Sequence, residues 1–206
     1  MPTSSKYGKL YTALMINKLK DLLPIESILD VGVGEGTYSD ILSPYLENAI
    51  WSGIEVWEPY ITEYNLGSKY QILINQDVRQ INFAEGPSYD IALFGDILEH
   101  MTKEEAQTLI KKVIPKTHLI MISIPIVHFP QDIVGGNPFE QHIKDNWSHE
   151  EVLESFPNII SAFIHNFIGV YFLSTNPEFS PIIRKLQSQI SKLVKKKFTT
   201  ETIFWA

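Results

Sequence analysis

The chain has 206 residues, of which 44% are hydrophobic and 20% charged, a composition typical of a globular protein and incompatible with wholesale disorder. It contains no cysteine, which excludes disulfide frameworks, thiolate zinc sites and cysteine nucleophiles. Residues 1–178 hold 11 Lys/Arg and 23 Asp/Glu, a net charge of −12, whereas residues 179–206 hold 6 and 1, a net charge of +5. An acidic body repels phosphate backbones, so nucleic acid is an unlikely partner.

No stretch of the sequence has the length of a membrane span or the pattern of an export signal. The longest strongly apolar run covers residues 119–127, far short of the roughly 20 residues that cross a bilayer. The first 25 residues carry charges and no central apolar block. We therefore expect a cytoplasmic protein.

Hydrophobic periodicity predicts helices and strands in alternation along the chain. Helices are expected over residues 7–23, 37–47, 59–66 and 102–114 and directly after residue 148. Strands are expected over residues 27–33, 50–56, 70–75, 89–94, 118–126, 159–165 and 169–174. Thr102 with Glu105, and Ser148 with Glu151, have the spacing of capping boxes at helix starts. The short link at residues 166–168 predicts that the last two strands form an antiparallel hairpin.

This alternation predicts an α/β fold in which a mostly parallel sheet is covered by helices on both faces. Such sheets bind ligands at the carboxyl ends of their strands, near the point where the strand order reverses. The chemistry is therefore expected just after residues 31, 55, 76, 94 and 125.

A glycine loop follows the first predicted strand, with the spacing G-x-G-x-G. Glycines at this place allow a tight turn and let a ligand approach bare backbone. Thr37 stands where a dinucleotide-binding fingerprint has its third glycine, and Asp30 and Glu35 place negative charge beside the loop. A cationic ligand is therefore favoured over a pyrophosphate, with a plain strand-to-helix turn as the alternative.

Acidic residues close the second and third predicted strands. Glu55 ends the second strand about twenty residues after the glycines, where a carboxylate can accept both hydroxyls of a ribose. Asp77 ends the third strand, where it can accept a hydrogen bond from an adenine amino group while Val78 flanks the ring. A surface glutamate and a turn-forming aspartate are the alternatives, but acidic residues at three successive strand ends favour a binding site.

The order and spacing of these segments over about residues 25–155 resemble the class I S-adenosylmethionine-dependent methyltransferases, and most closely the quinone-biosynthesis O-methyltransferases. The segments that carry the resemblance are Asp30-Val31-Gly32-Val33-Gly34-Glu35-Gly36, Gly53-Ile54-Glu55, Gln76-Asp77-Val78 and the run from Tyr89 to His100. The resemblance implies a Rossmann-like fold with a seven-stranded, mostly parallel sheet whose last strand is antiparallel. It also implies that S-adenosylmethionine is the cofactor.

The same resemblance implies which residues hold the cofactor. Its methionine end would lie on Asp30, Gly32 and Gly34, its ribose on Glu55, and its adenine on Asp77 and Val78, with Gly36 and Val56 completing the set. The segment Phe94-Gly95-Asp96 would pass under the transferable methyl group. The implied activity is methyl transfer to an oxygen or nitrogen of a small metabolite, sugar or lipid head group. A metal-assisted RNA-end methyltransferase and a non-catalytic cofactor-binding module are the alternatives.

Methyl transfer to a hydroxyl also needs a base near the ends of the fourth and fifth strands. We predict His142 for this role because it lies in the long, partly apolar loop of residues 127–147, which is expected to fold over the acceptor. His128, which directly follows the fifth strand, and His100 are the next candidates, whereas His149 and His165 are expected to be structural.

The predicted histidine base works without a metal ion, but a metal-dependent site is an alternative. In some quinone-biosynthesis and small-RNA 3′-end methyltransferases, an acid-x-x-Glu-His run binds a divalent ion. The corresponding residues here are Asp96, Glu99 and His100, to which a later histidine could be added. The competing interpretation is that Glu99 and His100 merely lead into the next helix.

The predicted domain covers residues 1–178 and begins with a helix that could lid the cofactor, on which Tyr7 and Tyr11 are either functional or core aromatics. Residues 179–206 form a basic amphipathic helix and tail. Three interpretations of this segment compete: packing on the sheet, attachment to an anionic membrane surface, and docking to a partner or a second copy of the chain. Its apolar and aromatic residues are Ile182, Ile183, Leu186, Ile190, Leu193, Val194, Phe198, Phe204 and Trp205.

Overall fold

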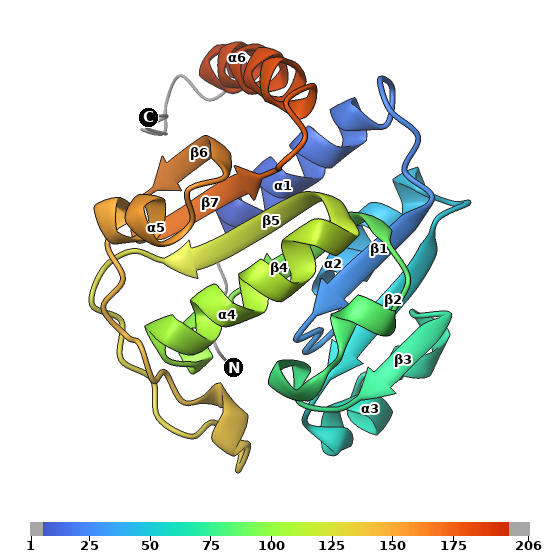
Figure 1. Ribbon diagram of the computed structural model, residues 1–206, viewed down its shortest axis with the longest axis vertical. Coiled ribbons are helices and arrows are strands. Elements are labelled where there is room, and N and C mark those ends of the chain that lie inside the picture. Colours follow the sequence, from blue (N-terminus) through green and yellow to red (C-terminus); the bar gives the residue numbers. More distant parts are fainter. Residues whose placement is uncertain (1–5, 198–206) are drawn as a thin grey trace.

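Seven strands form a single sheet in the order β3-β2-β1-β4-β5-β7-β6, in which only β7 is antiparallel to its neighbours (Figure 1). The computed structural model describes residues 6–197, with side chains described through residue 190. The strands are β1 (Ser27–Val31), β2 (Ile50–Glu55), β3 (Ile72–Asn75), β4 (Tyr89–Gly95), β5 (Thr117–Pro125), β6 (Ile159–His165) and β7 (Ile168–Leu173). The predicted α/β class, parallel sheet and terminal hairpin are confirmed.

Helices cover both faces of this sheet, which separates two hydrophobic cores. They are α1 (Lys6–Leu19), α2 (Thr37–Leu42), α3 (Glu58–Glu63), α4 (Lys103–Val113), α5 (His149–Ser155) and α6 (Phe179–Lys197). One core contains buried residues of α1, α2 and α6, and the other contains buried residues of α4 and α5. On β4, Ile91 and Leu93 enter the first core and Ala92 and Phe94 the second, as expected where successive side chains of a strand point to opposite faces.

Three helices end several residues earlier than their periodicity predicts, and one of them is α3, which was expected over residues 59–66 and ends at Glu63. The helix expected over residues 37–47 is α2 only to Leu42, and Pro44 lies in the following 3-10 turn, Ser43–Tyr45. The first helix, expected over residues 7–23, ends at Leu19, whose carbonyl accepts hydrogen bonds from the amides of both Leu22 and Leu23. Leu22 is 52% exposed, so continuing the helix would gain it no buried contact.

The two predicted capping boxes have different outcomes. At α4, Thr102 Oγ1 accepts from the Glu105 amide and the Glu105 carboxylate accepts from the Thr102 amide, which completes the box. At α5, Ser148 Oγ accepts from the Glu151 amide at 3.1 Å, but the reciprocal bond is missing from the described contacts. The Glu151 carboxylate instead pairs with Lys103 and Lys144, so this cap is only half of a box.

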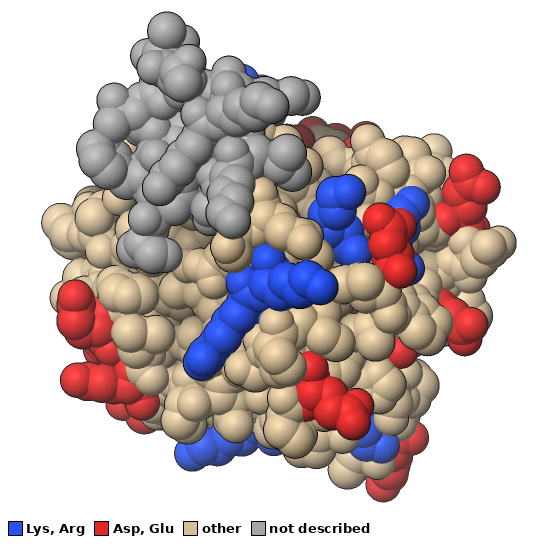
Figure 2. Space-filling model, turned by 90° about the horizontal axis from the view of Figure 1, so that it is seen from above, with Lys and Arg blue, Asp and Glu red and all other residues tan. Residues whose placement is uncertain are grey.

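The C-terminal helix α6 packs its apolar side against α1 and β6. Ile183, Leu186 and Ile190 are buried there, and the Gln187 amide bonds Ser161 and the Ala162 carbonyl. This contact favours the packing interpretation. The face that carries α6 shows basic side chains near its centre, with acidic ones beside them and at the margins (Figure 2). The side chains of Leu193 and Val194, and residues Phe198, Phe204 and Trp205, lie outside the described part.

The N-terminal helix α1 also packs in the core, and it does not line the cavity that is described in the next section. Tyr11 is 1% exposed and stacks on Phe163, with ring centroids 4.4 Å apart. Tyr7 packs on His165 at 4.2 Å. None of the described residues that line the cavity comes from this helix. Among residues 6–197, no helix is both long and apolar enough to cross a membrane.

Candidate active site

The glycine loop lies at the carboxyl edge of the sheet, where β1 separates β2 from β4 and the strand order reverses. Gly32, Gly34 and Gly36 have φ values of 65°, 52° and 77°, in the left-handed region that glycine adopts without strain. A side chain on Gly32 would collide with Ile97, whereas a Cβ on Gly34 would meet no atom within 4 Å. The loop is therefore packed at its start and open at Gly34.

Glu55, at the end of β2, joins this loop to the next strand-end turn. Its Oε2 accepts from the Gly34 amide at 3.0 Å, and its Oε1 accepts from the Trp57 amide at 2.7 Å. The side chain is buried, and burial raises the pKa of its carboxyl despite these two amides. A carboxylate has about four acceptor positions, so acceptor capacity remains for a ligand hydroxyl.

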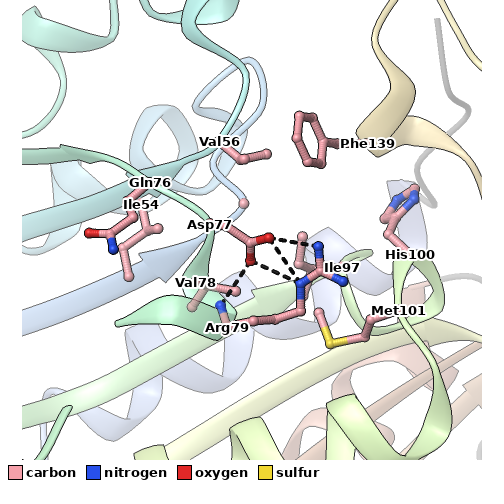
Figure 3. Close-up of a pocket in the computed structure, with 11 residues that line it drawn as sticks. Ile54, Val56, Gln76, Asp77, Val78, Arg79, Ile97, His100, Met101 and Phe139 are labelled. Atoms are coloured by element: carbon pink, nitrogen blue, oxygen red, sulfur yellow. Dashed lines mark hydrogen bonds and ion pairs between the residues drawn. The ribbon is translucent and has the colours of Figure 1, made fainter. Parts of the chain in front are cut away.

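A small, open cavity of about 50 Å³ lies at the same edge (Figure 3). Of the predicted residues, Gly32, Val56, Asp77, Val78 and His100 line it. Lining residues that the sequence analysis missed are Ile54, Gln76, Arg79, Ile97, Met101 and Phe139. Gln76 and Ile97 follow strand ends and could have been found by the same rule, and Phe139 lies on the loop that was expected to fold over the acceptor. No sequence pattern points the side chains of Arg79 and Met101 into the cavity.

Asp77 and Arg79 form an ion pair within this cavity wall. The Arg79 Nη2 lies 2.6 Å from Asp77 Oδ2, and its Nη1 lies 2.9 Å from Glu105 Oε1 at the start of α4. The hydrogen bonds from Arg79 hold the pKa of the Asp77 carboxyl below its usual range. Asp77 is therefore ionised and held in one orientation.

Other predicted cofactor residues lie beneath the edge. Asp30 is 2% exposed, its Oδ2 accepts from the Tyr70 hydroxyl at 2.6 Å, and burial raises its pKa to about 7. The Phe94 side chain is fully buried in the α4 core, so it cannot line the site. Gly95 leaves room for the Tyr38 ring, which a Cβ there would overlap. Asp96 follows it with φ 57° and accepts from Ser123 Oγ at 3.1 Å.

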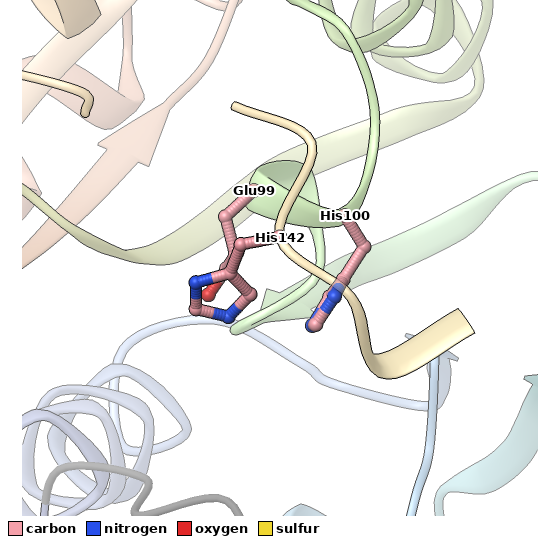
Figure 4. A group of neighbouring side chains, drawn as sticks. All are labelled: Glu99, His100 and His142. Carbon is pink, nitrogen blue, oxygen red and sulfur yellow. The ribbon is translucent and has the colours of Figure 1, made fainter. Parts of the chain in front are cut away.

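Two predicted catalytic histidines meet beside a buried glutamate. Glu99, His100 and His142 each offer a ligand atom within 4.8 Å of the others (Figure 4). Glu99 is 2% exposed, and its Oε2 has no hydrogen-bond partner among the described residues. The grouping contains Glu99, His100 and a later histidine, as in the alternative metal set, but Asp96 is not part of it.

Backbone carbonyls select the tautomer of both rings. His142 Nδ1 lies 2.6 Å from the Phe129 carbonyl, and His100 Nδ1 lies 3.1 Å from the Gln141 carbonyl. A carbonyl oxygen only accepts, so each Nδ1 carries the proton and each Nε2 of the neutral ring keeps its lone pair. Burial also lowers the pKa of His100 to about 4, which keeps this ring neutral near pH 7.

The remaining histidines lie apart from this group. His128 is 69% exposed at its side chain and lies 3.7 Å from Asp145, so it does not join His100 and His142. His149 approaches the Tyr171 hydroxyl at 3.0 Å, and His165 is buried against Tyr7, in keeping with structural roles.

The 127–147 loop is folded across the site. The amides of Ile143 and Lys144 both donate to the Glu99 carbonyl. On the opposite side, the Tyr60 hydroxyl of α3 donates to Glu140 Oε1 at 3.1 Å. Phe139 of the same loop lines the cavity. The loop therefore connects the histidine group with the helix that follows β2.

Comparison with solved structures identifies the fold. The chain matches the N-terminal domain of EvdMO1, solved with SAH bound, at TM-score 0.62 and 14% identity, covering 84% of this chain and 83% of that one. It matches an S-adenosylmethionine-dependent methyltransferase from Clostridium acetobutylicum at TM-score 0.64 and 13% identity, covering 82% and 92%. It matches magnesium protoporphyrin IX methyltransferase from Synechocystis, with bound SAM, at TM-score 0.57 and 16% identity, covering 82% and 81%.

No known protein family and no curated protein matches the sequence. The structural matches show that the chain has the Rossmann-like fold of the S-adenosylmethionine-dependent methyltransferases. At 13–16% identity they establish the architecture alone.

Proposed function

We propose that this protein is an S-adenosylmethionine-dependent methyltransferase that methylates an oxygen or nitrogen of a small molecule. One observation carries the proposal. A left-handed glycine loop, Glu55 bound to that loop, and Asp77 beside a cavity lie together at the switch point of the sheet. Ligands of open α/β sheets bind at this position, and the proteins of the same fold include structures solved with SAM or SAH.

The residues present fit this cofactor. The open side of Gly34 leaves space for a ligand against bare backbone. Glu55, with spare acceptor capacity, suits the ribose hydroxyls, and Asp77 and Val78 suit the amino group and face of adenine. Asp30 lies beneath the loop, where its negative form would favour the cationic methionine end through the field rather than by direct contact.

His142 is proposed to act on the acceptor. The bound cofactor supplies an electrophilic methyl group on a sulfonium, so the protein needs to position the acceptor and remove its proton. The Phe129 carbonyl fixes the tautomer of His142, so that the neutral ring presents an unprotonated Nε2 that can accept a proton from a hydroxyl or amine. His100 lies beside it, with ring centroids 4.8 Å apart, and is proposed to orient the acceptor.

A divalent cation is a second candidate, favoured by the Glu99, His100 and His142 group. Both ring Nδ1 atoms face backbone carbonyls, the arrangement that commonly orients metal-ligating histidines. The buried Glu99 Oε2, which has no partner among the described residues, would supply an oxygen ligand. When bound, the ion would lower the pKa of an acceptor hydroxyl, and His142 would then serve as a ligand rather than as the base.

Methyl-labelled cofactor, incubated with the protein and a cell extract, tests this proposal by showing which compound gains the label. His142→Ala should lower turnover about 10²-fold or more, with cofactor affinity nearly unchanged. His128→Ala is the matched control, because that exposed histidine lies outside the group and should leave turnover near the wild-type rate.

The other outcomes separate the alternatives. Full turnover in His142→Ala would contradict the assigned base. Loss of activity with a chelator and recovery with magnesium would favour the metal candidate. Label in RNA ends would favour the RNA-end alternative, and cofactor binding without any labelled product would favour a non-catalytic module.

A further inference from the structure

A second hollow lies near the C-terminal end of α4, apart from the glycine loop. Its volume is about 590 Å³, within the roughly 300–1,000 Å³ typical of small-molecule sites. Residues 80–84, between β3 and β4, line one side, and Lys111, Lys112 and Lys116 line the other. We call this hollow the lysine groove. It shares no lining residue with the cavity at the carboxyl edge, so the two hollows are distinct.

The lysine groove is cationic in an acidic protein. The whole chain has a net charge of −7, yet no Asp or Glu is among the residues described as lining the groove. Glu85, which follows the lining segment, is exposed and points its charge elsewhere than into this lining. Ile81 and the buried Phe83 add apolar surface. The groove therefore combines three positive charges with an apolar patch.

Two of the lysines reach across the groove rather than back to the end of α4. Lys112 Nζ donates to the Arg79 carbonyl at 3.3 Å, and Lys116 Nζ donates to the Gly86 carbonyl at 3.0 Å. These carbonyls flank the segment on the other side, so each ammonium group is anchored over the groove. An ammonium has three N–H donors, so both lysines keep donors for a ligand. Lys111 has no side-chain partner among the described residues.

We propose that the lysine groove binds a phosphate-bearing small molecule, with the three ammonium groups on a diphosphate or a similarly charged group. Lysine binds phosphate as a point charge through charge-assisted hydrogen bonds, and three lysines suit a group that carries more than one negative charge. Ile81 and Phe83 would contact a less polar part of the same molecule. This site is independent of the proposed methyl transfer, because none of its lining residues belongs to the cofactor cavity.

Titration calorimetry of the full chain with inorganic pyrophosphate, in a buffer without divalent cations, tests the proposal. The wild type should bind, and the combined Lys111→Gln, Lys112→Gln and Lys116→Gln variant should bind about tenfold more weakly or worse. The matched control changes Lys6, Lys18 and Lys185 to Gln. These exposed lysines lie on α1 and α6, which pack in the core on the other side of the sheet. The control has the same net charge as the test variant and should keep the wild-type affinity.

Two single variants keep the test valid if the triple variant is unstable. Lys111→Gln removes a side chain without a described partner, so it should weaken pyrophosphate binding about threefold without affecting the fold. Lys111→Arg keeps the charge and should restore most of the affinity. Gly34→Val changes the glycine loop alone and should leave pyrophosphate binding unchanged.

The contrary results are equally specific. Absence of pyrophosphate binding by the wild type overturns the proposal, as does equal weakening in the control variant. Loss of binding in Gly34→Val would place the pyrophosphate at the glycine loop instead. Lysine-dependent binding to phosphatidylglycerol vesicles, without binding of free pyrophosphate, would also overturn the proposal, because the groove would then contact a membrane surface rather than a small molecule.

Discussion

Asp30 is a carboxyl group that the fold holds out of water beneath the glycine loop. Burial raises its pKa to about 7, and the hydrogen bond from Tyr70 offsets this only in part. Between pH 4 and pH 7 the folded state therefore keeps a proton that the unfolded state has released. The contribution of Asp30 to stability is present below about pH 4 and is lost as pH rises through about 7.

Asp30→Asn should remove this dependence, because the amide oxygen can still accept from Tyr70 and carries no charge. The free energy of unfolding of the variant, relative to the wild type, should rise between pH 4 and pH 7 and level off above, by an amount on the order of a few kcal/mol. Urea unfolding at pH 5, 6, 7 and 8 measures it. Parallel pH curves for the two proteins would contradict the burial of an ionisable Asp30.

At the scale of single elements, α6 offers a direct test of what its apolar side does. Leu186 is 3% exposed and lies in the core shared with α1, whereas Gln189 on the same helix is exposed. Leu186→Ala should cost about 2–5 kcal/mol of stability, because it removes buried methyl groups and leaves a cavity. Gln189→Ala should change stability by less than about 0.5 kcal/mol.

Thermal or urea unfolding of both variants checks this expectation. If Leu186→Ala is as stable as the wild type, α6 is not part of the core, and the membrane and partner interpretations regain weight. Salt-sensitive co-sedimentation of the full-length protein with anionic liposomes would then distinguish them.

The type of an element, helix or strand, was predictable wherever its hydrophobic residues follow a helical spacing or form a short continuous run. The apolar face of α4, the continuous strands β4 and β5 and the hairpin of β6 and β7 follow from spacing alone. Element ends were less predictable, because the last turn of a helix forms only if tertiary contacts bury it, as Leu22 shows. The Ser148 box failed for a related reason, since Lys144 and the sequence-distant Lys103 compete for Glu151.

In the candidate site too, positions set by the local backbone were predictable and positions set by long-range contacts were not. Backbone-determined positions such as Gly34, Val56 and Asp77 could be placed from strand ends. The meeting of His142 with Glu99 and His100 depends on how a 21-residue loop folds, and no local pattern encodes that path. No local pattern predicts the ion pairs of Arg79 with Asp77 and Glu105 either, because they depend on how α4 packs beside the end of β3.

For the molecule as a whole, the proposed function requires that the carboxyl edge of the sheet hold S-adenosylmethionine. Calorimetry with S-adenosylhomocysteine and with NAD on three proteins tests this most directly. Gly34 and Gly135 both have left-handed φ values, 52° and 58°, and both have open space where a Cβ would lie. Valine therefore introduces similar backbone strain at either position, but only Gly34 lies in the proposed cofactor loop.

We predict that the wild type and Gly135→Val bind S-adenosylhomocysteine and not NAD, and that Gly34→Val loses the binding while remaining folded. Absence of S-adenosylhomocysteine binding by the wild type, tight binding of NAD, or undiminished binding by Gly34→Val would contradict the account.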